Sequence, residues 1–244
     1  MSDGAMSSRS YEHLVNKIIV PGDTMYHGNS DYYFKVGESA ISVIDACLSA
    51  AGAGEVNSIL DYACGYGRVL RWTKARFPDA RILASDVDEK ALAAVKDTLG
   101  VETRVADVEC CQDFGETFDL IWSGSLFTHL RESDTCRVLR FLFRQLSQRG
   151  ILIFTTHGPY VERRIAEEDK LYGLESDAKD WLVSAYLKTG YGFGAYPHQP
   201  SYGISAVTSA KMMTLVEQTG YEPIFYLERG WIQHQDVYAV HAAA

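Results

Sequence analysis

The stretch Ser58-Ile-Leu-Asp-Tyr-Ala-Cys-Gly-Tyr-Gly-Arg68 decides how the rest of the chain is interpreted. Its apolar start is typical of a short buried strand, which stops at Gly65 and Gly67, where the backbone turns without a side chain to block a ligand. From Val69 the apolar spacing predicts a helix that ends at Pro78. A strand, a glycine-rich turn and a helix N-terminus together form a cradle of nucleotide size.

Composition favours one globular enzyme-sized domain. The chain has 244 residues, of which 47% are hydrophobic and 23% are charged, which suits one large α/β domain with an insertion. The formal net charge of −9 argues against a nucleic-acid partner, because such partners usually need a basic stripe.

Cysteine usage and hydropathy indicate in which cellular compartment the protein is expected. There are five cysteines, without CxxC spacing, and the sequence shows no signal peptide, so we expect reduced thiols in a cytoplasmic protein. No apolar run has the length of a membrane span, so no membrane partner is expected. No Cys/His cluster has zinc spacing, so no metal site is expected either.

Upstream of the quoted stretch the pattern is less regular. A short helix is expected over residues 11–20, before Pro21-Gly22. Residues 23–37 are rich in aromatics and turn formers and fit neither a helix nor a strand, and a helix is then expected from about residue 38 to 51.

Downstream, apolar runs alternate with helical spacing. Strands are expected at residues 81–86, 102–107, 118–124 and 150–156, and helices at 88–99 and 132–146. A helix at 208–219 and two strands joined by a tight return, 222–228 and 235–240, follow. The predicted fold is therefore α/β and Rossmann-like, with a seven-stranded, mostly parallel sheet, an antiparallel last strand and helices on both faces.

One segment interrupts this alternation. Residues 158–205 combine many tyrosines with glycines and prolines, with a helical first half and a second half that suits a loop or loose hairpin. We expect four parts in a single folded unit: an N-terminal helical and aromatic cap (1–57), a cofactor-binding core (58–157), an aromatic lid or acceptor insertion (158–206) and the C-terminal part of the core (207–244). A plain packed subdomain, or a contact in a homodimer, are the alternatives for the lid.

Two kinds of nucleotide site place glycines after the first strand. The dinucleotide fingerprint G-x-G-x-x-G needs a third glycine, where this chain has Leu70. Asp86 ends the second expected strand and suits either kind of site, because both need a carboxylate for ribose hydroxyls. The glycine pair alone therefore leaves the nucleotide open.

The surrounding residues narrow the choice. Asp61-Tyr-Ala63-Cys-Gly65-Tyr-Gly67 resembles the first motif of class I S-adenosylmethionine-dependent methyltransferases, with Ala63 where that family usually has its first glycine. The resemblance extends over roughly residues 59–156, through Ser85-Asp-Val-Asp88, Ala106-Asp-Val108, Phe118-Asp-Leu-Ile-Trp-Ser-Gly-Ser125, Leu126-Phe-Thr-His-Leu130 and Arg149-Gly-Ile-Leu-Ile-Phe154. It implies S-adenosyl-L-methionine as cofactor.

The resemblance also implies roles for individual residues. Asp61 would face the amino-acid end of the cofactor, and Ala63, Gly65 and Gly67 would let the backbone approach it. The remaining cofactor-binding candidates lie at strand ends: Asp86 for the ribose with Val87 on the adenine, Asp107 for the adenine amino group with Val108 beside the ring, and Ser123 and Gly124 under the methionine portion. Ordinary turn chemistry is the alternative for Asp61, Gly65, Gly67 and Asp86. For Asp107 the competing alternative is a solvated strand end or a helix cap, and the two valines could belong to the core.

Four histidines are candidates for catalysis. Methyl transfer depends largely on positioning, and a hydroxyl acceptor usually benefits also from a general base. His157, after the fifth strand, and His129, after the fourth, are the leading candidates, although His129 suits a structural role and His157 could be an ordinary loop residue. His198 and His234 are weaker candidates.

Motifs of other methyltransferase classes are missing, which narrows the range of methyl acceptors. Ser123-Gly-Ser125 replaces the N-P-P-Y type motif, which disfavours amino-methylation of adenine or glutamine, and no acidic set like that of metal-dependent catechol-type enzymes follows strands four and five. The pairing of Tyr32-Tyr-Phe-Lys-Val-Gly37 with Leu60–Leu70 is similar to bacterial methyltransferases that accompany glycosyltransferases in surface-polysaccharide clusters.

We therefore expect an S-adenosylmethionine-dependent methyltransferase that acts on an oxygen of a saccharide or other small metabolite by direct in-line transfer. The alternatives are a NAD-dependent oxidoreductase and a non-catalytic cofactor-binding protein of the same fold.

Overall fold

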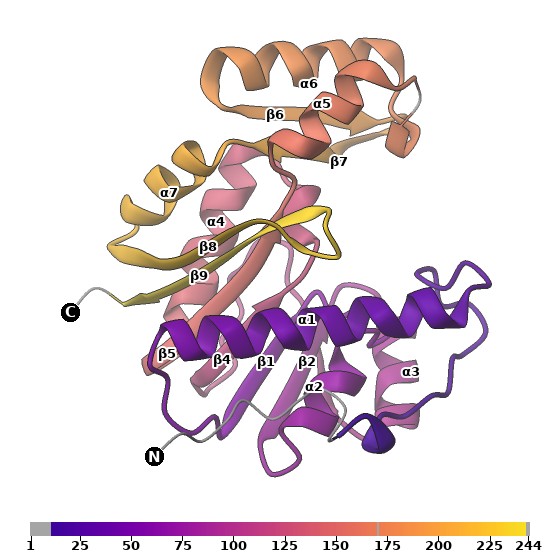
Figure 1. The fold of residues 1–244 in the computed structure, drawn as a ribbon, viewed down its shortest axis with the longest axis vertical. Helices are drawn as coiled ribbons and strands as arrows, with labels where there is room; N and C mark the ends of the chain where they lie inside the picture. The colour runs from indigo at the N-terminus through magenta and orange to yellow at the C-terminus, as the bar shows by residue number, and fades with distance from the viewer. Residues whose placement is uncertain (1–10, 170, 243–244) are drawn as a thin grey trace.

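The computed structural model describes residues 11–169 and 171–242. Its centre is a seven-stranded sheet of order β3-β2-β1-β4-β5-β9-β8 (Figure 1). The strands are β1 (Ser58–Tyr62), β2 (Arg81–Asp86), β3 (Glu102–Val105), β4 (Phe118–Ser123), β5 (Leu146–Thr156), β8 (Tyr221–Trp231) and β9 (Gln235–Ala242). The first five run parallel, and β9 is antiparallel to both β5 and β8. The predicted fold class is confirmed.

Helices cover both faces of this sheet. Helices α1 (Ser30–Ala50), α2 (Leu70–Arg76) and α3 (Glu89–Leu99) share one hydrophobic cluster, and α4 (Glu132–Arg144) and α7 (Ser209–Glu217) belong to another. Successive side chains of a strand point to opposite faces, so Ile59 lies in the first cluster and Leu60 in the second. This arrangement explains why the strands are apolar throughout rather than alternating.

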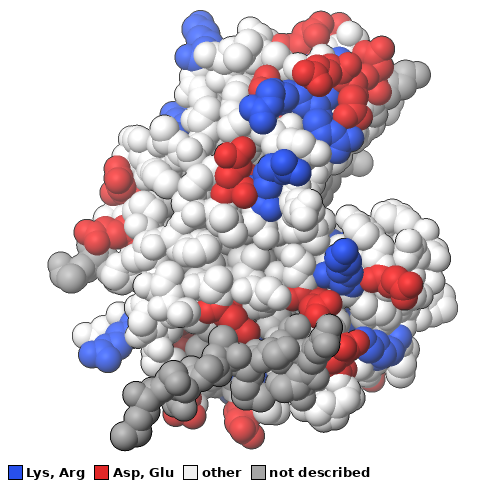
Figure 2. Space-filling view, viewed as in Figure 1, with Lys and Arg blue, Asp and Glu red and all other residues white. Residues whose placement is uncertain are grey.

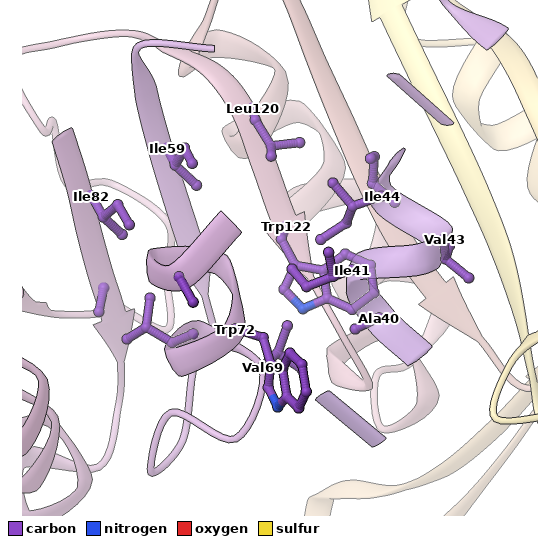
Figure 3. Close-up of a cluster of buried hydrophobic side chains, with 14 of the residues drawn as sticks. Ala40, Ile41, Val43, Ile44, Ile59, Val69, Trp72, Ile82, Leu120 and Trp122 are labelled. Atoms are coloured by element: carbon purple, nitrogen blue, oxygen red, sulfur yellow. The ribbon is translucent and has the colours of Figure 1, made fainter. Parts of the chain in front are cut away.

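Figure 3 shows the cluster beneath α1 and α2. Ile59 of β1, Ile82 of β2 and Trp122 of β4 share this cluster with side chains of the two helices, namely Ile41 and Ile44 of α1 and Trp72 of α2. Trp122 of β4 is almost fully buried, and its ring meets that of Trp231 edge to face, with centroids 5.4 Å apart. This packing fixes α1 across the sheet.

The N-terminal region differs from the prediction. Helix α1 starts at Ser30, eight residues before the expected 38, and the Asn29 side chain caps it by accepting a hydrogen bond from the Tyr32 amide. The buried positions Tyr33, Val36, Gly37 and Ala40 continue the helical spacing backwards. The helix expected over 11–20 is wrong: only the short 3-10 helix η2 (Glu12–Leu14) forms there.

Other boundaries shift by a few residues. Helix α4 ends at Arg144, and β5 begins at Leu146, four residues before the strand expected from 150. Strand β3 ends at Val105 rather than 107. The closing pair β8 and β9 is antiparallel, as predicted.

Residues of the expected insertion form a separate lobe at the top of Figure 1. It contains α5 (Pro159–Glu167), η4 (Leu171–Gly173), α6 (Ser176–Thr189) and a hairpin of β6 (Tyr191–Tyr196) and β7 (Gln199–Val207). The hairpin expected in its second half is therefore present. The lobe has a small hydrophobic cluster of its own, which includes Val161, Leu182 and Ile204.

The carboxyl edge of the sheet gathers the ends of several elements. Strands β1, β2, β4 and β5 all end there, and β9 begins there because Asp236 pairs with Thr156. Ligands of open α/β sheets bind along this edge. In the described part of the chain, no helix is long and apolar enough to cross a bilayer.

Candidate functional site

The glycine turn after β1 is held against β2. The amides of Ala63 and Cys64 both donate to the Ser85 carbonyl, at 2.8 and 3.2 Å. Gly67 has φ +77°, and a Cβ there would lie 2.9 Å from the Leu99 side chain, so this glycine permits close packing on α3. Gly65 has φ +52°, and a Cβ there would meet nothing within 4 Å. The turn therefore leaves open space beside Gly65.

Ala63 adopts an unusual conformation. Its φ is +65°, in the left-handed region that favours glycine. The alanine that stands where related sequences usually have glycine therefore carries backbone strain of about 1–2 kcal/mol. Such strain is often concentrated near functional sites.

Asp86 braces the turn from the end of β2. Its two carboxylate oxygens accept hydrogen bonds from the amides of Gly65, at 2.7 Å, and Asp88, at 2.9 Å. Each carboxylate oxygen has a second lone pair, so the oriented group keeps acceptor capacity for hydroxyl donors. The structure places Asp86 beside the glycine turn, where the sequence analysis expected it.

Asp61, in β1, is the most unusual ionisable group of the site. The residue is 3% exposed, and its Oδ2 has no hydrogen-bond partner within residues 11–169 and 171–242. Burial, and secondly the nearby charge of Asp86, raise the pKa of Asp61 to about 8. A buried carboxylate with an unused oxygen is unfavourable by itself, and a cation placed against it would relieve this cost.

The end of β4 contributes a second unpaired polar atom. Ser123 is fully buried, and its hydroxyl has no partner. A Cβ on Gly124 would lie 2.9 Å from the Trp122 ring, so the chain can pass this close only as glycine. Ser125 follows with φ +64°, and its amide donates to Thr155 Oγ1 at 2.8 Å.

The third carboxylate, Asp107, is arranged differently. Its oxygens accept from the amides of Glu109 and Cys111, both at 2.9 Å, and these bonds lower its pKa. In this structure Asp107 thus stabilises the turn that follows β3. Val87 and Val108 are 59% and 65% exposed, so they are not core residues and their apolar surfaces remain available for contact.

Both leading histidines bind the hairpin of the upper lobe. The Nδ1 of His129 lies 2.7 Å from the Gly203 carbonyl, and that of His157 lies 3.1 Å from the Ser205 carbonyl. A carbonyl only accepts, so each Nδ1 carries the proton and each Nε2 a lone pair. Burial is the first cause that lowers both pKa values, and the pKa of His157 falls to about 3, so this ring is neutral at physiological pH.

Several residues that build the site were not identified from the sequence. Gln235 accepts from Thr155 Oγ1 at 2.5 Å and donates to Ser125 Oγ at 2.9 Å, which joins the ends of β4, β5 and β9. The predicted antiparallel pairing of the last strands was the available signal. Arg71, on α2, is buried and donates to the carbonyls of Asn16 and Ile18, which holds the N-terminal segment against the glycine turn.

A cavity of about 430 Å³ lies at the carboxyl edge of the sheet, beside the end of β8. Four parts of the chain line it: the first turn of α1, helix α5, η4, and the end of β8 with the turn to β9. The lining residues include Tyr32, Tyr160, Arg164, Tyr172, Arg229 and His234. We call it the arginine pocket. His234, a weaker candidate in the sequence, lies here, whereas His198 does not.

A larger depression, of about 610 Å³, lies at the opposite edge, beside Asn57 and Ala80, which precede β1 and β2. Because ligands bind at the carboxyl ends of the strands, this depression does not belong to the site. Within residues 11–169 and 171–242 there is no group of three or more His, Cys, Asp or Glu that could hold a metal ion.

Comparison with known proteins agrees with this geometry. Residues 59–150 match the family model described as a methyltransferase domain. A malonyl-[acyl-carrier protein] O-methyltransferase of Bacillus anthracis is 35% identical over 127 residues, which cover 51% of this chain and 45% of that protein. A malonyl-[acyl-carrier protein] O-methyltransferase of Salmonella typhimurium is 29% identical over 113 residues, which cover 46% of this chain and 43% of that protein. The chain thus spans less than half the length of these curated relatives.

Solved structures share the fold across most of the chain. The protein PH0226 of Pyrococcus horikoshii superposes with a TM-score of 0.65 at 12% identity, covering 92% of this chain and 97% of that one. CalS10 of Micromonospora echinaspora, an amino pentose methyltransferase solved with bound S-adenosylmethionine, gives 0.60 at 17% identity, covering 89% and 100%. The chain therefore contains a methyltransferase domain over residues 59–150 and shares the fold of solved S-adenosylmethionine-dependent methyltransferases, in agreement with the resemblance stated from the sequence.

Proposed function

We propose that this chain binds S-adenosyl-L-methionine between the glycine turn and the end of β2, and transfers the methyl group to an oxygen of a small acceptor. One observation carries the proposal: the buried Asp61 carboxylate has an oxygen without a partner among the described residues and lies close enough to Asp86 to be affected by its charge, while Asp86 holds the open turn at Gly65. Such a site suits a ligand that brings an ammonium group and ribose hydroxyls.

Each residue of the cradle would contact a different part of the cofactor. When bound, the cofactor supplies a methyl group on a positively charged sulfur. Asp61 would hold the ammonium, and Asp86, already oriented by two amides, would accept from the ribose hydroxyls. Val87 and Val108 would cover the adenine, and the unpaired Ser123 hydroxyl would bond to the methionine portion beside Gly124. Asp107 reaches the adenine amino group only if its carboxylate accepts a further bond.

The matched domain supports an oxygen acceptor, because the curated relatives are named O-methyltransferases. The solved sugar methyltransferases share the fold alone and do not identify the acceptor atom. We propose a saccharide or other small metabolite that enters beneath the lobe of α5 to β7, with this lobe acting as a lid. The neutral His157, and less directly His129, would accept a hydrogen bond from the acceptor through Nε2 and orient it for in-line transfer.

Calorimetry with S-adenosylmethionine and S-adenosylhomocysteine tests the cofactor. We expect both to bind with one site per chain and NAD not to bind; the reverse result would exclude the proposal. Asp86→Ala should weaken S-adenosylhomocysteine binding by more than about tenfold, because charged hydrogen bonds of about 1.5–3 kcal/mol are lost. Asp79→Ala, an exposed carboxylate at the opposite edge, is the matched control and should leave the affinity unchanged.

Turnover separates an enzyme from a binding protein. Formation of S-adenosylhomocysteine with a panel of hydroxyl and carboxylate acceptors is the expected result. Binding without turnover on any acceptor would favour the non-catalytic alternative.

Two further proposals concern the whole protein. We propose a cytoplasmic protein without a nucleic-acid partner, and association into a homodimer. On the face shown in Figure 2, acidic and basic residues are interspersed and form no continuous basic stripe, which supports the absence of a nucleic-acid surface there. Sedimentation equilibrium tests the homodimer, and a mass equal to one chain at every concentration would exclude it.

A further inference from the structure

The arginine pocket carries positive charge, and none of the described residues that line it is a carboxylate. This contrasts with the chain as a whole, whose net charge is −9. Of its two arginines, Arg164 is paired with Glu168, at 2.6 and 3.0 Å. Arg229 forms no ion pair with any of the described residues. The uncompensated charge therefore belongs to Arg229.

The guanidinium of Arg229 is oriented from two sides. Its centre lies 4.0 Å from the Tyr160 ring, and its Nε donates to the Gln233 carbonyl at 2.9 Å. The Asp236 carboxylate of the neighbouring strand β9 accepts from the Arg229 backbone amide at 2.9 Å and from the Tyr226 hydroxyl at 3.0 Å. The terminal N–H groups of Arg229 thus remain as free donors in an orientation suited to a planar or tetrahedral anion.

The pocket is built from a strained backbone. Four of its lining residues have positive φ without being glycine: Tyr172 at +57°, Arg229 at +54°, Ile232 at +49° and Gln233 at +56°. Such conformations cost free energy and persist where the surroundings enforce them, often at ligand sites. Arg229 lies where the register of β8 against β9 shifts, and Ile232 and Gln233 belong to the turn between these strands.

An aromatic wall connects this pocket to the end of β5. The Tyr172 ring stacks on His157 with centroids 5.2 Å apart, and the His234 ring meets His157 edge to face at 5.7 Å. Tyr172 and His234 also share a hydrogen bond between the hydroxyl and Nε2. A molecule held by Arg229 would therefore contact Tyr172 and His234, whose rings in turn contact His157 at the carboxyl edge of the sheet.

We propose that the arginine pocket is the anchoring subsite of the acceptor, where Arg229 binds a carboxylate or phosphate group and Tyr172 and His234 support the adjoining part of the molecule. The acceptor is then an acidic metabolite, such as a sugar acid or sugar phosphate, and not a neutral sugar. This inference rests on the proposed function, since it assigns the acceptor of the same reaction.

The test uses inorganic phosphate and acetate as minimal anions on the full chain, with backbone amide NMR signals of residues 229–234 as the readout at constant ionic strength. Both anions should give saturable shifts in the wild-type protein, and the tighter of the two identifies the acceptor group. Arg229→Gln should weaken the binding at least about fivefold, as expected for loss of a charged hydrogen bond. Arg149→Gln, an exposed arginine near the opposite edge, is the control and should bind like the wild type.

Absence of saturable shifts with both anions, or equal binding by Arg229→Gln, would overturn the inference. Melting temperatures of the variants show whether they are folded. The affinity for S-adenosylhomocysteine is measured on the same proteins and should be equal in all of them. Failure of the wild type to bind this ligand would count against the proposed function, whereas loss of anion binding alone counts only against the subsite.

Discussion

The two halves of the carboxyl edge differ in charge and in construction. The cradle between β1, β2 and β4 is acidic, with Asp61 and Asp86 around an open glycine turn. The arginine pocket beyond β5 is basic and aromatic, and contains no lining carboxylate. The same sheet edge therefore offers separate sites to two ligands of opposite charge, because a cationic methyl donor favours the acidic cradle and an anionic acceptor favours the arginine pocket.

The largest expected effect concerns Asp61. Asp61→Asn should weaken S-adenosylhomocysteine binding about 30-fold or more, because a buried partner of an ammonium loses its charge. The same change should leave phosphate binding in the arginine pocket unaltered. Calorimetry with each ligand measures both, with Asp79→Asn as control. If both affinities fell together, the two regions would not be independent.

Cofactor binding should depend on pH through the same group. In the free protein the pKa of Asp61 is raised to about 8, above its ordinary value, so the carboxyl is mostly protonated at neutral pH, and a bound cation would ionise it. The affinity for S-adenosylhomocysteine should therefore rise with pH up to about 8, by as much as about tenfold per unit, and then level off. Asp61→Asn should lose the part of this slope that belongs to Asp61. An identical profile in the variant would contradict the assignment.

The stability of the unliganded protein should fall with rising pH, whereas the affinity for S-adenosylhomocysteine should rise. Because the raised pKa favours the protonated carboxyl, the free energy of unfolding should fall as the pH rises from about 4 through about 8. Urea unfolding across this range measures it, and Asp61→Asn should remove the contribution.

His157 should matter more for stability than for proton transfer. Its pKa is lowered to about 3, mainly by burial, so it stays neutral while the unfolded chain takes up a proton below about pH 6.5. His157→Gln should cost about 1–3 kcal/mol at neutral pH through the lost bond to Ser205. It should also remove up to about 1.4 kcal/mol per pH unit of acid sensitivity between pH 6 and 4. Chemical unfolding at several pH values measures both effects, and an unchanged acid slope would show that His157 titrates normally.

The smallest expected effect is at Ala63. Ala63→Gly should stabilise the protein by up to about 1 kcal/mol, since the relief of a left-handed alanine exceeds the entropic cost of glycine. The same change at the exposed helical Ala93 should destabilise the protein by about 1 kcal/mol. Thermal melting of the two variants should therefore show shifts of opposite sign, and a fall in both would mean that Ala63 is not strained.

The contrast between the two regions also explains what could be predicted. The cradle is encoded in consecutive strand–turn units, so the spacing of Asp61, Gly65, Gly67 and Asp86 was sufficient to place them together. The seven-stranded, mostly parallel sheet with its antiparallel last strand followed from the same alternation of apolar runs and helical spacing.

The arginine pocket could not be predicted in this way. It collects Tyr32 with Tyr160, Arg164 and Tyr172 and with Arg229 and His234, and only the tertiary fold brings these parts of the chain together. Tyr32 was assigned to the N-terminal aromatic cap but not to a helix, because the aromatic residues and Gly37 obscured the helical spacing of the first turns of α1. The positive φ of Arg229 and Ile232 had no signal, since neither residue type favours a turn.

The most direct test of this division measures two ligands on two variants. S-adenosylhomocysteine and inorganic phosphate are each titrated into wild-type protein, Asp61→Asn and Arg229→Gln at pH 8.5, where Asp61 of the wild type is largely ionised. The predicted result is that Asp61→Asn loses affinity only for S-adenosylhomocysteine and Arg229→Gln only for phosphate. Unchanged binding of S-adenosylhomocysteine by Asp61→Asn would contradict the acidic donor site on which the account depends.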